Sequence, residues 1–325
     1  MALHRSMNQL SAIVILVVLS GFPAYADTGF DIWVEELKVE ARSQGIDSAL
    51  LDRVFQGMKP LPQVLRHDRH QPESTITFEQ YRTRTVNRER IRKGRQMLAR
   101  HHTLLQKIGH QYGVQPRFLV AFWGVESDYG RYTGQFHVLE ALATLAYDGR
   151  RSAYFRKELF NALSIVQEGS ISLPVMKGSW AGAMGHIQFM PSSFRRFAVD
   201  YDGDGRKDIW TTPADIFASA ANYLSRSGWQ EGERWGRRAT LPSGFNATHA
   251  TLNIKKPLHD WHQLGVRREN GARLPLSAMD GSIVLPGGRK GPAYLVYENF
   301  RVTMKWNRSQ YFAISVGLLA DAIIQ

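Results

Sequence analysis

The apolar segment that starts at Pro116 constrains the fold of this chain more than any other part of the sequence. Proline is favoured in the first turn of a helix, and apolar residues follow it at spacings that cover most of the helix circumference. A helix that is apolar on nearly every side must be buried, so other elements must surround it. The apolar positions are Phe118, Leu119, Ala121, Phe122, Trp123 and Val125.

One acidic residue, Glu126, stands in "FWGVESDYG" where this apolar segment is about to end. It shares a helix face with Leu119 and Trp123, so its surroundings are apolar. An apolar environment raises the pKa of a carboxylic acid, and an acid that stays protonated near neutral pH can act as a general acid. The alternative is a carboxylate that reaches solvent and pairs with Arg131. Taken alone, the motif favours this alternative, because structural carboxylates outnumber catalytic ones.

The rest of the pattern predicts an α+β protein that is mainly α. Two helices are expected within residues 30–57, an extended proline-rich segment over 59–73, and helical structure from about 78 to 112. Short apolar runs between glycines and prolines, at 250–254, 282–286 and 293–298, indicate a β-rich insertion. The predicted domains are an α-helical N-terminal domain over 27–112, a catalytic core over 113–239, a small β-rich domain over 240–300, and a C-terminal segment over 301–325 that completes the core.

The first 26 residues have the features of a secretory signal. Arg5 precedes the apolar run "SAIVILVVLSGF", and "AYA" supplies small residues before Asp27, where we expect cleavage. An uncleaved membrane anchor is the alternative, but the run is short for a membrane span. The chain has no cysteine, which excludes a lipoprotein anchor, disulfides, thiolate metal sites and cysteine nucleophiles. We therefore predict a soluble, exported protein with no stable membrane anchor.

The formal net charge is +12, and much of it lies in the basic segment 82–100. Such a segment suits an anionic polymer. Because an exported protein rarely meets nucleic acid, we expect an envelope polymer and no nucleic acid as its partner. A solvated basic helix face is the alternative.

A second segment, "GSWAGAMGHIQFMPSSF" (178–194), combines small residues with one amide side chain. Small residues allow the backbone to approach a ligand closely, Gln188 offers both a donor and an acceptor, and Pro191 opens a helix. A tightly packed turn has the same composition, so the local pattern leaves both interpretations open.

Four motifs together resemble the lytic murein transglycosylase B family: "FWGVESDYG", "GSWAGAMGHIQFMPSSF", "YDGDGRKDIW" and "WNRSQYFAISVGLLADAI". They occur in the family's order, and the resemblance runs from about Phe30 to Ile324. It implies a lysozyme-like catalytic core that cleaves the glycan strands of peptidoglycan in the periplasm, leaves 1,6-anhydromuramic acid ends, and needs no cofactor for its chemistry.

The resemblance also implies roles for individual residues. Glu126 would be the catalytic acid and base. Many relatives have a tyrosine where this chain has Phe312, with Tyr311 one position earlier, so which of the two takes the tyrosine's place is open. The residues that the resemblance implies for substrate binding are Tyr81, Ser179, Gln188, Phe189, Met190, Tyr223, Asn307 and Tyr311.

The loop "DYDGDGRKDIW" begins like an EF-hand calcium loop. Asp200, Asp202 and Asp204 occupy alternate positions, Gly205 is at position six, and Arg206 would contribute its backbone carbonyl at position seven. Asp208 falls at position nine, but position twelve is Thr211, not the usual glutamate. The family binds a metal ion here with a late acidic residue, which implies Asp215 as the substitute. We predict a structural Ca²⁺ site, the alternative being a turn of aspartates that accept backbone hydrogen bonds.

These observations lead to a peptidoglycan lytic transglycosylase as the principal hypothesis. A lysozyme-like muramidase, which would use water as the nucleophile, is the second. A calcium-dependent murein-binding protein without catalysis is the third, although a pure binder has no need of a buried acid at Glu126.

Overall fold

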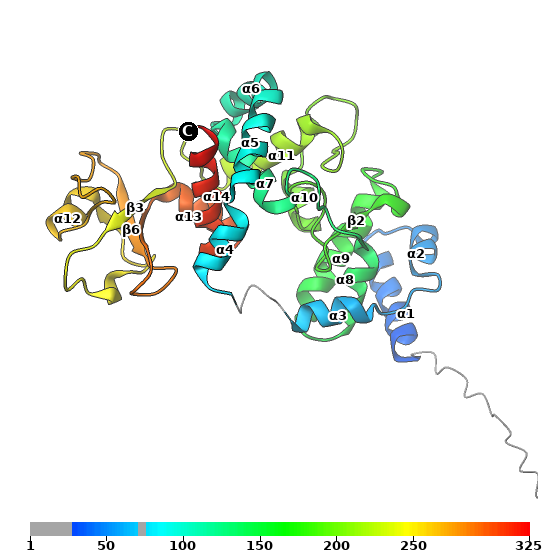
Figure 1. The fold of residues 1–325 in the computed structure, drawn as a ribbon. Helices are drawn as coiled ribbons and strands as arrows, with labels where there is room; N and C mark the ends of the chain where they lie inside the picture. Colours follow the sequence, from blue (N-terminus) through cyan, green and yellow to red (C-terminus); the bar gives the residue numbers. More distant parts are fainter. Residues whose placement is uncertain (1–27, 71–75) are drawn as a thin grey trace, which may run out of the picture.

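The computed structural model describes residues 28–70 and 76–325, so the predicted secretory signal lies outside the described residues. The described part is mainly helical, with a five-stranded antiparallel sheet at one end of an elongated molecule (Figure 1). This confirms the predicted α+β class.

The helices make up most of the described chain, and Figure 1 carries labels for most of them. The α-helices are α1 (Thr28–Ser43), α2 (Ser48–Phe55), α3 (Pro62–Arg69), α4 (Phe78–Thr85), α5 (Arg88–Arg100), α6 (His102–Tyr112), α7 (Pro116–Ser127), α8 (Val138–Tyr147), α9 (Ser152–Gln167), α10 (Pro191–Phe197), α11 (Pro213–Arg226), α12 (Leu258–Gln263), α13 (Glu298–Trp306) and α14 (Gln310–Ile323), with 3-10 turns η2 (Leu173–Val175) and η3 (Ala247–His249).

The strands form two sheets. A two-stranded ribbon pairs β1 with β2, and the larger sheet has the antiparallel order β4-β6-β7-β3-β5. The strands are β1 (Phe136–His137), β2 (Lys177–Gly178), β3 (Gly236–Thr240), β4 (Lys256–Pro257), β5 (Arg267–Arg268), β6 (Asp280–Val284) and β7 (Ala293–Val296).

Helix α7 is the buried helix that the sequence predicts. The N-cap residue, Gln115, has an extended backbone, and Pro116 lies in the first turn. Phe118, Leu119 and Phe122 have no exposed surface. Helices α5, α6, α11 and α14 pack around α7, and Figure 1 shows α14, close to the C-terminus, beside it. The C-terminal segment therefore completes the core.

At the end of the molecule opposite the large sheet, α1, α2 and α3 lie next to α8 and α9 (Figure 1). Arg156 of α9 donates from Nε to Glu40 of α1 at 2.8 Å, and the Asp47 backbone N–H donates to Gln167 of α9 at 2.7 Å. The side chain of Asp47 also caps α2. These contacts attach the N-terminal helices to the core helices.

The prediction of an extended segment over residues 59–73 is wrong for its middle part, which forms α3. Pro62 lies in the first turn, where its missing N–H is not needed, and Val64 is fully buried. At the other end of the helix, buried Asp68 accepts hydrogen bonds from Arg150 and Arg151. Tertiary contacts thus stabilise a helix that proline content disfavours.

The helices of residues 28–112 belong to two packing groups. The first three contact α8 and α9, whereas α4, α5 and α6 contact α7, α11 and α14. The two groups are joined through residues 70–77, of which 71–75 lie outside the described residues. The domain boundaries given above remain a prediction.

The large sheet has a small hydrophobic core of its own, built around Trp261 and Leu295. Trp261 is fully buried and donates its indole N–H to the Gly281 carbonyl at 2.8 Å. The predicted β runs at 282–286 and 293–298 overlap β6 and β7, whereas residues 250–254 contain no strand. Strand β3 begins at Gly236, before the predicted start of this region.

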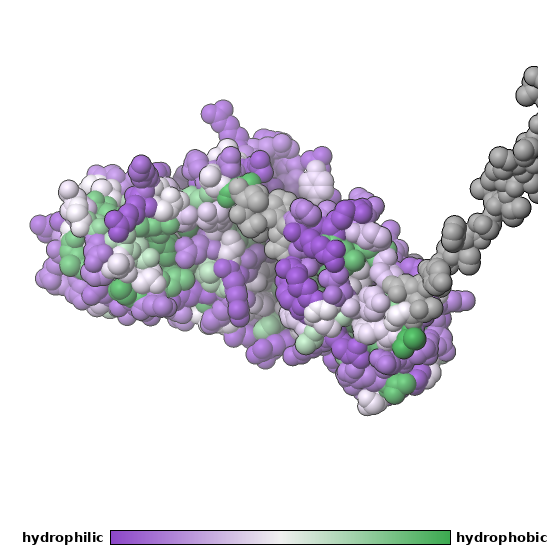
Figure 2. Space-filling view, turned by 90° about the horizontal axis from the view of Figure 1, so that it is seen from below, coloured by the Kyte–Doolittle hydropathy of each residue, from purple (hydrophilic) through white to green (hydrophobic). Residues whose placement is uncertain are grey.

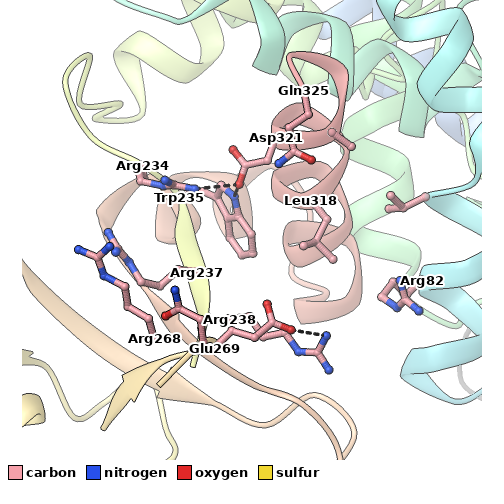
Figure 3. Close-up of a pocket in the computed structure, with 13 residues that line it drawn as sticks. Arg82, Arg234, Trp235, Arg237, Arg238, Arg268, Glu269, Leu318, Asp321 and Gln325 are labelled. Carbon is pink, nitrogen blue, oxygen red and sulfur yellow. Dashed lines mark hydrogen bonds and ion pairs between the residues drawn. The ribbon is translucent and has the colours of Figure 1, made fainter. Parts of the chain in front are cut away.

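A tryptophan joins this sheet to the helical core. Trp235, which is 1% exposed, donates its indole N–H to Asp321 of α14 at 3.0 Å, and Arg234 approaches the same carboxylate at 3.3 Å. Figure 3 shows both side chains directed toward Asp321 from the chain that enters β3. The junction is therefore held by hydrogen bonds as well as by packing.

Hydrophilic residues cover most of the face drawn in Figure 2, and hydrophobic residues appear on it as small separate patches. Across residues 28–70 and 76–325, none of the helices combines the length and the apolar character that a membrane span requires.

Candidate active site

Glu126 lies in the last turn of α7 and is half-buried. Trp306, the last residue of α13, donates its indole N–H to Glu126 Oε1 at 2.7 Å. The two residues are 180 positions apart in the sequence. A hydrogen bond to a carboxylate restricts its orientation, so Trp306 orients the only acid that the sequence nominates for catalysis.

Aromatic rings surround this hydrogen bond. The ring of Trp306 lies 4.6 Å from Phe122, 5.1 Å from Phe189 and 4.7 Å from Tyr223, centroid to centroid. We call Phe122, Phe189, Tyr223 and Trp306 the aromatic cluster. Trp306 was not predicted from the sequence as a functional residue, although it is the first residue of the fourth motif. The available signal was its indole N–H, a hydrogen-bond donor on a large and otherwise apolar side chain.

The acid nearest to Glu126 in the sequence, Asp128, is held by basic residues. Its carboxylate lies 3.2 Å from Lys93 Nζ, 3.5 Å from Arg90 Nε and 3.9 Å from Arg131 Nη1. Arg131 thus contacts Asp128, whereas the sequence-based alternative paired it with Glu126. Asp128 has a φ of 51°, so the chain turns away from the helix immediately after Ser127.

The small-residue loop 178–190 is tied to the end of α7. Buried Ser127 donates its hydroxyl to the His186 carbonyl at 2.6 Å. Gly130 has a φ of +84°, and a Cβ there would lie 2.3 Å from His186 Cε1, so only glycine fits this contact. The His186 backbone N–H donates to the Ile209 carbonyl at 2.9 Å. The loop is therefore fixed between α7 and the acidic loop.

Two predicted substrate-binding residues shape this loop from within. The Ser179 hydroxyl oxygen accepts the backbone N–H groups of Ala181 and Ala183, at 3.3 and 3.0 Å. Gln188, with a φ of 48°, donates its amide Nε2 to the carbonyls of Thr133 and Gly185, at 3.0 and 2.8 Å. Its amide oxygen is the atom that this arrangement leaves for a ligand.

The other residues predicted to bind substrate fall into two places. Phe189 is 2% exposed, so it supports the aromatic cluster from inside, and Met190 is half-buried at the N-cap of α10. The hydroxyl of Tyr223 donates to the Lys305 carbonyl at 2.8 Å. Asn307 follows Trp306, and its side-chain oxygen accepts the Ser309 N–H at 3.0 Å.

The structure separates the two candidates for the tyrosine position. Phe312 is 3% exposed and packs on Phe122 at 6.0 Å between ring centroids. Tyr311 is half-buried, 5.9 Å from Tyr81 by the same measure. Tyr311 and Tyr81 thus form a pair where α14 meets α4. Of the two candidates for the tyrosine position, Tyr311 is the one with exposed surface.

The acidic loop brings its first three aspartates together. The carboxylate oxygens of Asp200, Asp202 and Asp204 lie within 4.8 Å of one another. Asp200 accepts the backbone N–H groups of Gly203 and Gly205, at 2.8 and 2.9 Å. Oxygen ligands that converge in this way suit Ca²⁺.

Asp215 and Asp208 hold the second half of this loop. Asp215 is 1% exposed, and its two oxygens accept the backbone N–H groups of Tyr201 and Asp208, at 2.7 and 2.8 Å. Burial raises the pKa of Asp215, although these backbone N–H groups oppose the effect. Thr211, at position twelve, hydrogen-bonds through its hydroxyl to Asp208. The side chain of Arg206 is exposed, as expected for a residue that contributes only a carbonyl.

A helical core, an oriented carboxylate and a fixed loop beside it are the arrangement that the hypothesis of a glycan-cleaving enzyme with one candidate acid requires. Comparisons with known proteins give the particular family. The family described as "Transglycosylase SLT domain" matches residues 29–321. The membrane-bound lytic murein transglycosylase B of Escherichia coli is 30% identical over 301 residues, which cover 86% of this chain and 79% of that protein.

Solved structures agree with this match. SltB3 from Pseudomonas aeruginosa, in complex with NAG-anhNAM-pentapeptide, is 44% identical with a TM-score of 0.87, covering 91% of this chain and 79% of that one. The E. coli lytic transglycosylase Slt35, in complex with calcium, is 29% identical with a TM-score of 0.76, covering 91% and 92%.

This chain belongs to the transglycosylase SLT domain family. It is a peptidoglycan lytic transglycosylase with a lysozyme-like fold. The predicted family, fold class, activity class and peptidoglycan partner are therefore confirmed, whereas the roles of individual residues remain predictions.

Proposed function

We propose that Glu126 alone performs both proton transfers in the cleavage of the bond between N-acetylmuramic acid and N-acetylglucosamine. The observation that carries this proposal is the contrast between Glu126, oriented by Trp306, and Asp128, engaged by Lys93 and Arg90. A hydrolase of the retaining or inverting type needs a second carboxylate, about 5–5.5 Å or about 6.5–9.5 Å from the acid. The acid nearest in sequence is committed to basic partners.

A single acid suffices if the substrate supplies the remaining groups. Glu126 protonates the oxygen of the leaving sugar, and the 2-acetamido group of muramic acid supports the positive charge that develops at C1. Glu126, now a carboxylate, then takes the proton of the C6 hydroxyl, whose oxygen closes on C1. The product carries a 1,6-anhydro ring, and no water is consumed.

The remaining side chains hold the sugar in the pose that ring closure requires. In this proposal the fixed loop contributes Ser179, Gln188 and Met190, and Phe189 supports the wall behind them. Tyr223 packs against Trp306, and Asn307 follows Trp306 in the sequence. Tyr81 and Tyr311 extend the groove, and Tyr311, not Phe312, takes the place of the family's tyrosine, because Phe312 is buried.

We propose that the substrate strands carry their peptides. SltB3 has been solved with disaccharides that bear a pentapeptide, in both the muramic and the anhydromuramic form. The chain would meet such strands in the periplasm, in keeping with the signal predicted for its first 26 residues.

The acidic loop is proposed to hold Ca²⁺ for stability and not for chemistry. Asp200, Asp202 and Asp204 would supply side-chain oxygens, and Arg206 its backbone carbonyl. Asp215, which the family resemblance implied as a further ligand, would instead order the loop through its two backbone hydrogen bonds, because the group of converging carboxylates consists of the other three aspartates. The calcium complex of Slt35 supports this choice of ion.

Digestion of purified sacculi in ¹⁸O-labelled water, followed by mass spectrometry of the products, tests the proposed reaction. We expect 1,6-anhydromuramic acid ends without label. Labelled reducing ends as the main product would establish a muramidase, and intact sacculi would leave only a murein-binding role.

A further inference from the structure

We propose that a basic pocket beside Tyr223 binds the carboxylates of the peptide attached to the bound glycan. This inference rests on the proposed function. The pocket lies between α9, α10, α11 and the end of α13, and has a volume of about 630 Å³. We call it the stem pocket and define it by Lys157, Arg196, Tyr223, Arg226 and Lys305.

The stem pocket has an excess of positive charge. Four of its lining residues are basic, and none of the lining residues, which all belong to the described part of the chain, is acidic. The cavity where the large sheet joins α14 is different: its arginines share the lining with Glu269 and Asp321, which contact Arg238 and Arg234 (Figure 3). The stem pocket, unlike that cavity, therefore combines basic residues with an acid-free lining.

The cations of the stem pocket are held by neighbouring groups. Lys305 Nζ donates to the Ser227 carbonyl at 2.7 Å, and Arg226 Nη1 donates to the Arg196 carbonyl at 3.1 Å. The guanidinium groups of Arg196 and Arg226 lie 5.0 and 5.5 Å from the ring centroid of Phe197. An ammonium group has three N–H donors and a guanidinium five, so these contacts position the charges without exhausting them.

Two of the neutral polar residues of the lining, Ser192 and Tyr223, contribute to the fold. Ser192 donates its backbone N–H and its hydroxyl to Glu158, at 2.8 and 2.7 Å, and Glu158 is 2% exposed. The hydroxyl of Tyr223 donates to the Lys305 carbonyl. The carboxylate of Glu158 thus faces inward, and the charged groups that line the pocket are all cationic. The ligand they select is an anion.

The position of the pocket identifies which anion is within reach. Tyr223 belongs both to the stem pocket and to the aromatic cluster, where its ring lies 4.7 Å from Trp306, the residue that donates to Glu126. Lys305 directly precedes Trp306. An extended pentapeptide spans up to about 17 Å, so a peptide on a muramic acid at Glu126 reaches the pocket with its terminal carboxylate.

The test compares cleavage of two substrates, glycan strands that bear their peptides and the same strands after an amidase has removed them. The variant Lys157→Gln/Arg196→Gln neutralises two exposed cations of the pocket. The matched control, Arg289→Gln/Lys290→Gln, removes the same two residue types from an exposed loop of the large sheet. Lys157→Gln alone serves as a second variant, to be used if the double variant is poorly folded.

The measured ratio is kcat/KM for peptide-bearing strands divided by kcat/KM for bare strands. We expect this ratio to fall about 3- to 10-fold in the pocket variant, mainly through KM. In the control it should stay at the wild-type value. In wild type the ratio should fall with added salt, because the screening length shrinks from about 10 Å at 0.1 M to about 3 Å at 1 M.

An unchanged ratio in a folded pocket variant, an equal fall in the control, or a wild-type enzyme without preference for peptide-bearing strands overturns the inference. Failure of the proposed function would give a different result. In that case Glu126→Gln would still cleave both substrates, whatever the ratio between their kcat/KM values.

Discussion

Glu126 and Asp215 are carboxylates on two contacting helices of one core, α7 and α11, and their surroundings differ. Asp215 is 1% exposed and accepts a backbone N–H on each oxygen, whereas Glu126 is half-buried and accepts the indole N–H of Trp306. A carboxylate that accepts backbone donors on both oxygens stabilises the path of the chain. One that a side chain orients at a partly exposed position can exchange a proton with a bound sugar.

The sharpest test of this comparison is Glu126→Gln. The amide is nearly isosteric but cannot donate and reclaim the proton, so we expect activity to fall at least ~10²–10⁴-fold with an unchanged melting temperature. Turnover on sacculi and thermal unfolding are the measurements. Glu168→Gln, which changes an exposed glutamate at the C-cap of α9, should leave both unchanged. More than a tenth of wild-type activity in a folded Glu126→Gln would remove Glu126 from catalysis.

Trp306→Phe tests whether the indole is what distinguishes Glu126. Loss of its N–H frees the carboxyl group to reorient, and misplacement by about 1 Å can reduce the rate about 10²-fold. We expect kcat to fall about 10- to 100-fold, with a smaller change in KM. Trp229→Phe is the control, because its indole N–H donates at 2.9 Å to Gln115, away from Glu126. Equal kcat values in the two variants would assign Trp306 to packing alone.

Asp215→Asn tests the other side of the comparison. The amide retains one acceptor oxygen and turns an N–H₂ group toward the second backbone donor, which destabilises a buried site by about 1–3 kcal/mol. Chemical unfolding with metal removed should show this loss in the free energy of unfolding. The variant should keep residual activity at denaturant concentrations below its unfolding transition. Asp202→Asn, at an exposed position of the same loop, should unfold like wild type under these conditions. Unchanged stability of Asp215→Asn would contradict the structural role.

Calcium should affect stability and not chemistry. A ligand that binds only the folded state at ten times its dissociation constant stabilises it by about 1.4 kcal/mol, so we expect a higher melting temperature in calcium and unchanged kcat. Asp204→Ala should abolish the shift, whereas Asp280→Asn, at an exposed aspartate of β6, should retain it. A chelator without effect on the melting temperature of wild type would show that the loop folds without a bound ion.

The smallest expected effect concerns Asp68, a structural carboxylate far from Glu126. The hydrogen bond from Arg150, helped by Arg151 and opposed by burial, holds the pKa of Asp68 below its ordinary value of 3.8. The unfolded chain binds the proton of the Asp68 carboxyl group more readily than the folded chain does. The stabilisation from Asp68 is therefore fully present at pH values above its ordinary pKa, and it is lost as the pH falls through the lower folded-state pKa. The free energies of unfolding of wild type and Asp68→Asn should converge in that acidic range. A difference that stays constant with pH would contradict this.

Much of the catalytic core could be predicted from local patterns. The apolar circumference after Pro116 predicted α7 and the place of Glu126 at its end. Alternating aspartates predicted the cluster of Asp200, Asp202 and Asp204, because alternate residues in a tight loop converge. These features depend on residues that are neighbours in the sequence, so periodicity and turn chemistry are sufficient to detect them.

Other features depend on contacts between distant segments and could not be predicted in this way. Helix α3 forms in a proline-rich segment because Val64 is buried and Asp68 has two arginine partners. The helices of residues 28–112 divide between two packing groups, a division that their periodicity does not reveal. Amphipathic spacing identifies the face of a helix that is buried, but not the element that covers it.

By itself, the sequence determined the mainly helical class, the buried helix α7, the acid at its end and the aspartates of the loop, because each follows from the spacing of nearby residues. Only the tertiary structure decided that Trp306 orients Glu126 across 180 positions and that Lys93 and Arg90 engage Asp128. It also decided that Tyr311 keeps exposed surface while Phe312 is buried. These outcomes depend on how α5, α7, α13 and α14 pack, and packing partners are chosen by shape and chemistry over the whole core.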